Sequence, residues 1–135
     1  MKFPETKTKI YSILVVDLSE CTYADIYSDA EIKIIFQDRS DVPNKHHKGG
    51  QSAARFARCR DNEITQWFKS INEKLKNVRD EIYLGINSVY QRRFIKTLTT
   101  YNQQKIKEVR GTEYTDLSGI FQYMKKLDEE RNKKH

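Results

Sequence analysis

The sequence predicts an α/β protein with a single domain, built as a mixed five-stranded sheet flanked by helices. Its 135 residues fit one domain with a real hydrophobic core. Short β-branched apolar segments are interspersed with longer segments whose apolar residues recur at helical spacing. No apolar run approaches the roughly 20 residues of a membrane helix, and no signal core follows Met1. We therefore expect a cytoplasmic protein without a membrane span.

Three strands are predicted in the first part of the chain. Residues 10–18 form a nearly continuous apolar run, which is typical of a strand buried on both faces. Residues 22–27 and 31–36 follow after short polar turns and read as further strands. Because short connections favour antiparallel neighbours, we expect an antiparallel meander.

A long helix is predicted over residues 52–77. Apolar side chains recur there at spacings of three and four residues, including Ile64, Phe68 and Ile71. Such a helix would be roughly 39 Å long, with Ser52 as its cap or in its first turn.

The remaining segments alternate between strand and helix. We expect a strand at 81–86 and a strand at 105–109. Between them, Ser88 should cap a helix from Val89 to about Thr99, with Val89, Phe94 and Leu98 facing inward. A last helix, capped by Thr115 or Asp116, should bury the side chains Leu117, Ile120, Phe121, Met124 and Leu127. The order βββαβαβα is that of a ribonuclease H-like sheet. The domain would span residues 1–135 with its core at about 9–127, and residues 128–135 would be a frayed charged tail.

The formal net charge of +6 indicates a polyanionic partner. The distribution of charge sharpens this indication, because no acidic residue lies between Asp41 and Asp61. That stretch contains Lys45, His46, His47, Lys48, Arg55, Arg58 and Arg60. A segment of one sign in a chain of mixed charge is where phosphate contacts are expected.

Residues 37–51 lack periodicity and include Gly49 and Gly50, so they are predicted to form a long loop, a feature that is often functional. Residues 45–60 read Lys-His-His-Lys-Gly-Gly-Gln-Ser-Ala-Ala-Arg-Phe-Ala-Arg-Cys-Arg. This stretch resembles the middle domain of eukaryotic and archaeal class-1 peptide chain release factors. That family typically has Lys-His-Gly-Arg before Gly-Gly-Gln and Ser-Ala-Leu-Arg-Phe-Ala-Arg-Leu-Arg after it. The chain departs from the pattern at His47, Lys48, Ala54 and Cys59.

The resemblance implies hydrolysis of peptidyl-tRNA in the ribosomal peptidyl-transferase centre. Its catalytic residues would be Gly49, Gly50 and Gln51, with the Gln51 backbone N–H stabilising the charge that develops on the ester. The residues implied to contact rRNA or tRNA are Lys45, His46, His47, Lys48, Ser52, Arg55, Arg58 and Arg60. Gln51 is also a candidate for methylation, as in the family.

The resemblance requires no cofactor and no metal. The partners it implies are large-subunit rRNA and P-site peptidyl-tRNA, and we expect the protein to act as a monomer. The decoding and GTPase-recruiting domains of full-length factors do not fit in 135 residues. The expected activity is therefore codon-independent release or rescue, or the catalytic part of a termination factor with a separate decoding or GTPase partner.

Two other interpretations remain open. The first is a factor that occupies the peptidyl-transferase centre without hydrolysis. The second is a nuclease that holds two metal ions on clustered carboxylates, for which Asp17, Glu63 and Asp80 could be nominated. We favour it less than the release-factor interpretation, which rests on a coherent basic loop. Cys21 and Cys59 have neither metal-ligand spacing nor a disulfide framework, and we expect both to act as small hydrophobic side chains.

Overall fold

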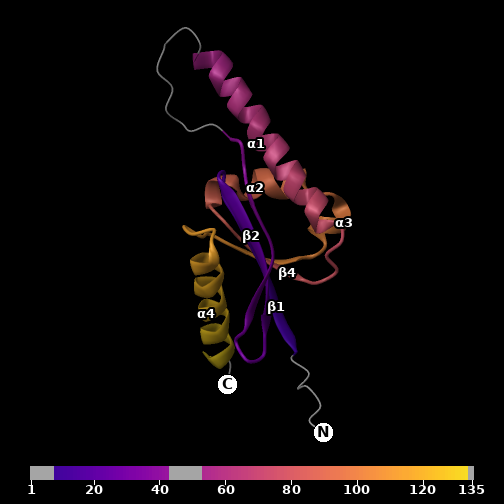
Figure 1. Cartoon of the computed structure of the whole chain (residues 1–135), viewed down its shortest axis with the longest axis vertical. Coiled ribbons are helices and arrows are strands. Elements are labelled where there is room, and N and C mark those ends of the chain that lie inside the picture. Colours follow the sequence, from indigo (N-terminus) through magenta and orange to yellow (C-terminus); the bar gives the residue numbers. More distant parts are fainter. Residues whose placement is uncertain (1–7, 43–52, 134–135) are drawn as a thin grey trace.

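The computed structural model of the chain describes residues 8–42 and 53–133, with side chains described for 8–42 and 57–132 (Figure 1). Its single sheet has the strand order β3-β2-β1-β4-β5. The strands are β1 (Lys9–Val16), β2 (Glu20–Tyr27), β3 (Ile32–Arg39), β4 (Ile82–Ile86) and β5 (Ile106–Arg110). The first three pair antiparallel, whereas β4 is parallel to both β1 and β5. The predicted mixed five-stranded α/β fold and its antiparallel meander are confirmed.

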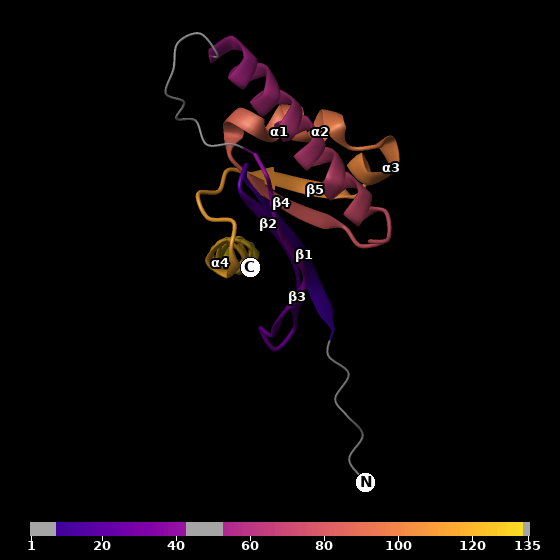
Figure 2. The same ribbon diagram turned by 45° about the horizontal axis from the view of Figure 1, so that its top comes forward.

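The sheet lies between two layers of helix. The helices α1 (Ala53–Leu75), α2 (Ser88–Thr97) and the short α3 (Thr100–Gln103) cover one face, and α4 (Leu117–Lys133) covers the other (Figure 2). Leu14 and Val16 of β1 point into the core beneath α1, while Ile13 and Val15 point into the core beneath α4. All four side chains are fully buried, so β1 is the strand buried on both faces that its apolar run predicted. None of the helices within the described residues is long and apolar enough to cross a bilayer.

The start of α2 differs from the prediction. Asn87, rather than Ser88, is the N-cap, and its side chain accepts a hydrogen bond of 2.9 Å from the Val89 N–H. Val89 was expected to face inward, but 76% of it is exposed. The phase of α2 is set by Phe94, which is fully buried, and a residue five positions earlier falls on a different side of a helix with 3.6 residues per turn.

The predicted frayed tail is wrong as far as Lys133, because α4 continues to that residue. Asp116 caps this helix by accepting from the Ser118 N–H at 3.0 Å, so one of the two nominated caps is confirmed. Contacts to the sheet hold the end of α4: Glu130 pairs with Arg110 of β5. Leu117 and Phe121 were expected to be buried but are about half exposed, since only the stripe through Ile120, Met124 and Leu127 faces the sheet.

Candidate functional site

Most of the predicted site lies outside the described residues. This holds for Lys45, His46, His47, Lys48, Gly49, Gly50, Gln51 and Ser52, and for the side chain of Arg55. The structure instead shows the two supports between which this loop runs. One is the segment that follows β3, and the other is α1, which begins two residues after Gln51.

The support on the β3 side is tied to the turn between β1 and β2. The Ser40 N–H donates to the Ser19 carbonyl at 2.8 Å, and the Ser40 hydroxyl donates to the Leu18 carbonyl. Val42 is partly buried against the core beneath α1. The chain is therefore anchored to the body up to the last residue described before the loop.

The support on the other side is a helix that extends beyond the sheet. With 23 residues, α1 is roughly 34 Å long. Its core contacts begin at Ile64, of which 3% is exposed, and continue through Phe68, Ile71 and Leu75. Residues 57–63 are exposed except for Arg60, which is half-buried. Eleven residues of α1, about 16 Å of helix, thus precede Ile64. Figure 1 shows this end of α1 extending away from the sheet.

Several polar contacts hold α1 to the body. The Trp67 indole N–H donates to the Asp17 carbonyl at the end of β1, at 2.7 Å. Lys74 forms an ion pair of 3.1 Å with Asp38 of β3. Arg93 of α2 contacts Asp61 and Thr65, near the point where α1 begins to extend beyond the core.

Arg93 contacts α1 through one ion pair and two hydrogen bonds. One guanidinium nitrogen lies 2.8 Å from the Asp61 carboxylate. The other donates to the Asp61 carbonyl at 2.8 Å and to the Thr65 hydroxyl at 2.9 Å. The sequence reasoning missed this positioning residue, and no local pattern could have revealed it because the partners lie 28 to 32 residues apart.

The predicted basic residues on the described part of α1 are where a ligand could reach them. Arg58 is exposed and Arg60 is half-buried. Cys59 lies between them and is exposed, so the expectation that it is a packed hydrophobic side chain is wrong. Cys21 is buried as expected, and burial raises the pKa of its thiol to about 12.

The nominated nuclease carboxylates do not converge. Asp17 lies after β1, where it accepts from the Ser19 and Glu20 N–H groups and from the Thr115 hydroxyl. Asp80 is bound to Lys9, at the opposite end of β1, at 2.8 Å. Glu63 is exposed on α1. Within residues 8–42 and 53–133, no three His, Cys, Asp or Glu side chains are grouped so as to hold a metal ion.

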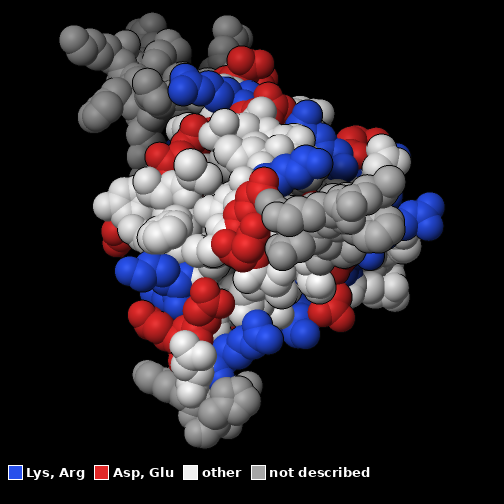
Figure 3. Space-filling view, turned by 60° about the horizontal axis from the view of Figure 1, so that its bottom comes forward, with Lys and Arg blue, Asp and Glu red and all other residues white. Residues whose placement is uncertain are grey.

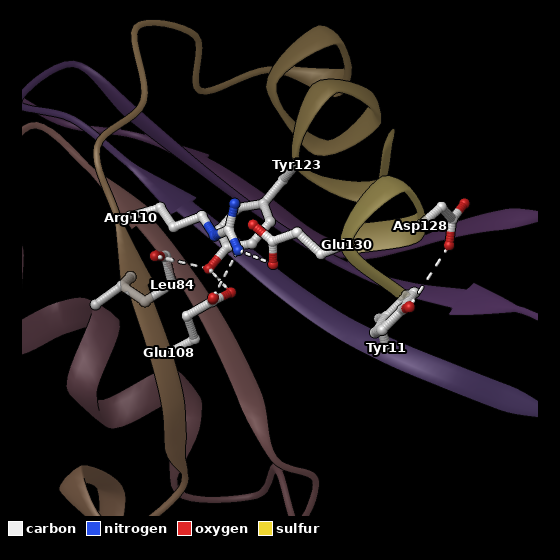
Figure 4. A network of polar contacts seen from close by, with 7 residues as sticks. All are labelled: Tyr11, Leu84, Glu108, Arg110, Tyr123, Asp128 and Glu130. Atoms are coloured by element: carbon white, nitrogen blue, oxygen red, sulfur yellow. Dashed lines mark hydrogen bonds and ion pairs between the residues drawn. The ribbon is translucent and has the colours of Figure 1, made fainter. Parts of the chain in front are cut away.

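A second polar cluster lies on the α4 side of the sheet (Figure 4). Arg110 pairs with Glu108 at 2.8 Å and with Glu130, while the Tyr123 hydroxyl donates to Glu108 at 3.0 Å. The hydrogen bond from Arg110 lowers the pKa of Glu108 below its usual range, and burial raises that of Tyr123. A pocket of about 390 Å³ opens beside this cluster, lined in part by Asn87, Arg110 and Lys126. Since Arg110 is neutralised by its two glutamates, we assign the cluster to the attachment of α4.

Comparison with known proteins decides the family. Residues 10–133 match the sequence profile of the family described as eRF1 domain 2. The chain belongs to this family.

Its relatives are archaeal release factors. It is 31% identical to peptide chain release factor subunit 1 of Picrophilus torridus over 129 residues, which cover 89% of this chain and 31% of that protein. The same-named protein of Thermoplasma acidophilum is 31% identical over 131 residues, covering 90% and 31%. The chain therefore spans about a third of the length of these relatives.

The solved structure of Thermoplasma acidophilum Pelota protein shares the fold. It aligns with a TM-score of 0.57 and 16% identity over 85% of this chain and 31% of that protein. The resemblance of residues 45–60 to the middle domain of release factors is thus confirmed as family membership. In the sequence of this domain, Gly49, Gly50 and Gln51 lie between an anchored segment after β3 and a helix that extends outward.

Proposed function

We propose that this domain promotes hydrolysis of the ester between peptide and tRNA in the ribosomal peptidyl-transferase centre. Gly49, Gly50 and Gln51 act at the ester, and the surrounding cations contact rRNA and tRNA. The observation that carries the proposal is the intact Gly-Gly-Gln in its family context, directly ahead of a helix whose start lies about 16 Å beyond the core. A protruding cationic tip suits a narrow site built of RNA.

The proposed catalysis needs only backbone groups and water from the protein side. Glycines at 49 and 50 allow close approach of the backbone and positive φ angles. The Gln51 N–H stabilises the oxyanion, and one such oriented donor is typically worth about 10²–10³ in rate. Its side chain admits water in preference to larger nucleophiles, and methylation of Gln51 would act on this selection.

The finer proposal is that these residues work without reading a codon, as a release or rescue activity in the cytoplasm, with one copy acting per ribosome. Decoding or delivery by a separate GTPase partner would add to the activity without altering the loop chemistry. The other candidate function is occupation of the same centre without hydrolysis. The retained Gly49-Gly50-Gln51 favours hydrolysis, because a plug could tolerate other residues there.

The decisive experiment measures labelled peptide freed from ribosomes that carry a defined peptidyl-tRNA and an empty A site. We expect release on both stop and sense codons. Gly50→Ala should nearly abolish it because a Cβ obstructs the backbone, whereas Gln51→Ala keeps the N–H and should lose less. A larger loss for Gln51→Ala would refute backbone catalysis. If wild type frees no peptide but shields the centre from chemical probes, the plug function is correct.

A further inference from the structure

A second acid-free stretch lies far from the loop in sequence. Residues 82–107 contain no Asp or Glu, but they contain Arg92, Arg93, Lys96, Lys105 and Lys107. Two of these cations are used within the fold. Lys105 is buried and donates to the Leu75 carbonyl at the end of α1, and Lys107 pairs with Glu81. The remaining three lie on α2.

The fold brings this stretch beside the first one. The helix α2 packs along α1, with the rings of Phe68 and Phe94 in an edge-to-face contact at 5.1 Å (Figure 2). Arg93 joins the two helices at Asp61 and Thr65. The start of α1, from the first stretch, and α2, from the second, therefore lie in one layer of the molecule, on the side of the sheet away from α4.

The exposed cations of this layer lie next to the junction. Arg58 and Lys69 are seven residues before and four after Thr65, so all three share the side of α1 that Arg93 contacts. Arg92 and Lys96, one turn apart, flank Arg93 on α2. All four are exposed, and none forms a salt bridge with another of the described residues. We define the α1–α2 face by Arg58, Lys69, Arg92 and Lys96.

Charge on α4 is mixed. On α4, Lys125 and Lys126 are followed by three acidic residues, 128–130. Seen from the end where β1 begins and α4 ends, basic and acidic side chains are interspersed (Figure 3). The four cations of the α1–α2 face lie on two packed helices, of which α2 carries no acidic residue.

We propose that the α1–α2 face binds the phosphate backbone of a double-helical segment of rRNA, as a second contact beside the loop. This inference rests on the proposed ribosomal function, and it adds Lys69, Arg92 and Lys96 to the RNA-contacting residues. Arg58 and Lys69 are about 16 Å apart along α1, a distance that faces several successive phosphates of a duplex. Cations fixed on two packed helices position a protein on a backbone without reading bases.

The test compares two double variants with the same loss of charge. Arg92→Gln with Lys96→Gln removes two cations from the α1–α2 face, and Lys125→Gln with Lys126→Gln removes two from α4. Gln preserves helix propensity in both. Binding to purified large ribosomal subunits is measured between about 50 and 200 mM salt. Losing two phosphate contacts should reduce the slope of log K against log salt by about 2. Over this salt range, the affinity of the variant should therefore fall about tenfold less than that of wild type. The α4 variant should keep the wild-type slope.

Equal slopes for the two variants would overturn the proposal. A second binding measurement uses protein-free large-subunit rRNA. If the α2 variant is weakened on subunits but not on this RNA, the face binds a ribosomal protein and the proposal is wrong. Peptide release by the wild-type protein, measured in parallel, separates the two proposals, because release tests the loop and the salt slopes test the α1–α2 face. If wild type releases nothing while the slopes still differ, the hydrolytic function fails and the RNA-binding face stands.

Discussion

Replacing Arg93 should impair peptide release more than it impairs folding. Arg93 is the contact between α2 and the base of the extending part of α1. The substitution Arg93→Met keeps the alkyl chain but removes the guanidinium, and with it the bonds to Asp61 and Thr65. The ion pair with Asp61 is largely exposed, with 65% of the Asp61 side chain accessible, so it contributes at most about 1 kcal/mol. The bond to the Thr65 hydroxyl adds about another 1 kcal/mol.

The effect on release follows from the length of α1 beyond its contact with the core. Beyond Ile64, α1 extends about 16 Å, so a tilt of roughly 4° at its base moves the start of the helix by about 1 Å. A misplacement of about 1 Å in reacting groups can cost on the order of 100-fold in rate. We therefore expect a fall in the release rate between about 10-fold and 100-fold. A protein of ordinary stability stays folded when it loses about 2 kcal/mol, so unfolding would not account for this fall.

The matched control is Gln91→Ala in the same helix. Its side chain donates to the Ile86 carbonyl at 3.1 Å, and it makes no hydrogen bond to α1. Urea unfolding would give the free energy of each variant, and single-turnover release at saturating protein would give the rate. If Arg93→Met releases at the wild-type rate, or if both variants lose rate in proportion to stability, α1 is not positioned by Arg93.

Two further predictions concern the α4 side of the sheet. Gly85→Ala places a Cβ 3.0 Å from a Val15 methyl and 3.2 Å from the Tyr123 ring. Thermal or urea unfolding should therefore show that the free energy of unfolding falls by about 1–3 kcal/mol. An unchanged free energy of unfolding would mean that α4 shifts freely. Since Arg110 holds the pKa of Glu108 below its ordinary value of 4.5, this carboxylate stabilises the fold above that value and ceases to do so as the pH falls through its lowered pKa. Glu108→Gln should therefore flatten the acid limb of a stability–pH profile below about pH 4.5, and an unchanged limb would contradict the assignment.

Local sequence patterns predicted the helices and strands but not the long-range contacts that hold them together. The apolar run of β1 and the three-and-four spacing of α1 reflect burial that each segment requires by itself, so both were predictable. The last residues of α4 were mistaken for a frayed tail because their charges were read alone. Glu130 is held by Arg110, 20 residues away, and no local spacing predicts such a pair.

The candidate site divides in the same way. Gly49, Gly50 and Gln51 were found because their neighbours follow a family pattern, and their roles remain predictions. What the structure adds to the site is the contacts that hold the chain segments before and after the predicted loop. Ser40 ties the segment after β3 to the turn between β1 and β2, and Arg93 ties α1 to α2. Neither residue belongs to the basic stretch that first suggested function.

The two hydrophobic cores, one on each face of the sheet, explain why the predicted loop can be polar and glycine-rich without weakening the fold. The core beneath α1 is complete from Ile64 onward, and the core beneath α4 is closed by Ile120, Tyr123 and Leu127. Residues 57–59 of α1 are exposed and contribute no side chain to either core. Substitutions of Arg58 should therefore change ribosome binding while leaving the free energy of unfolding within about 0.5 kcal/mol of wild type. This prediction separates the stability of the domain, which resides in the sheet and its two helical layers, from the proposed ribosome contact at Arg58.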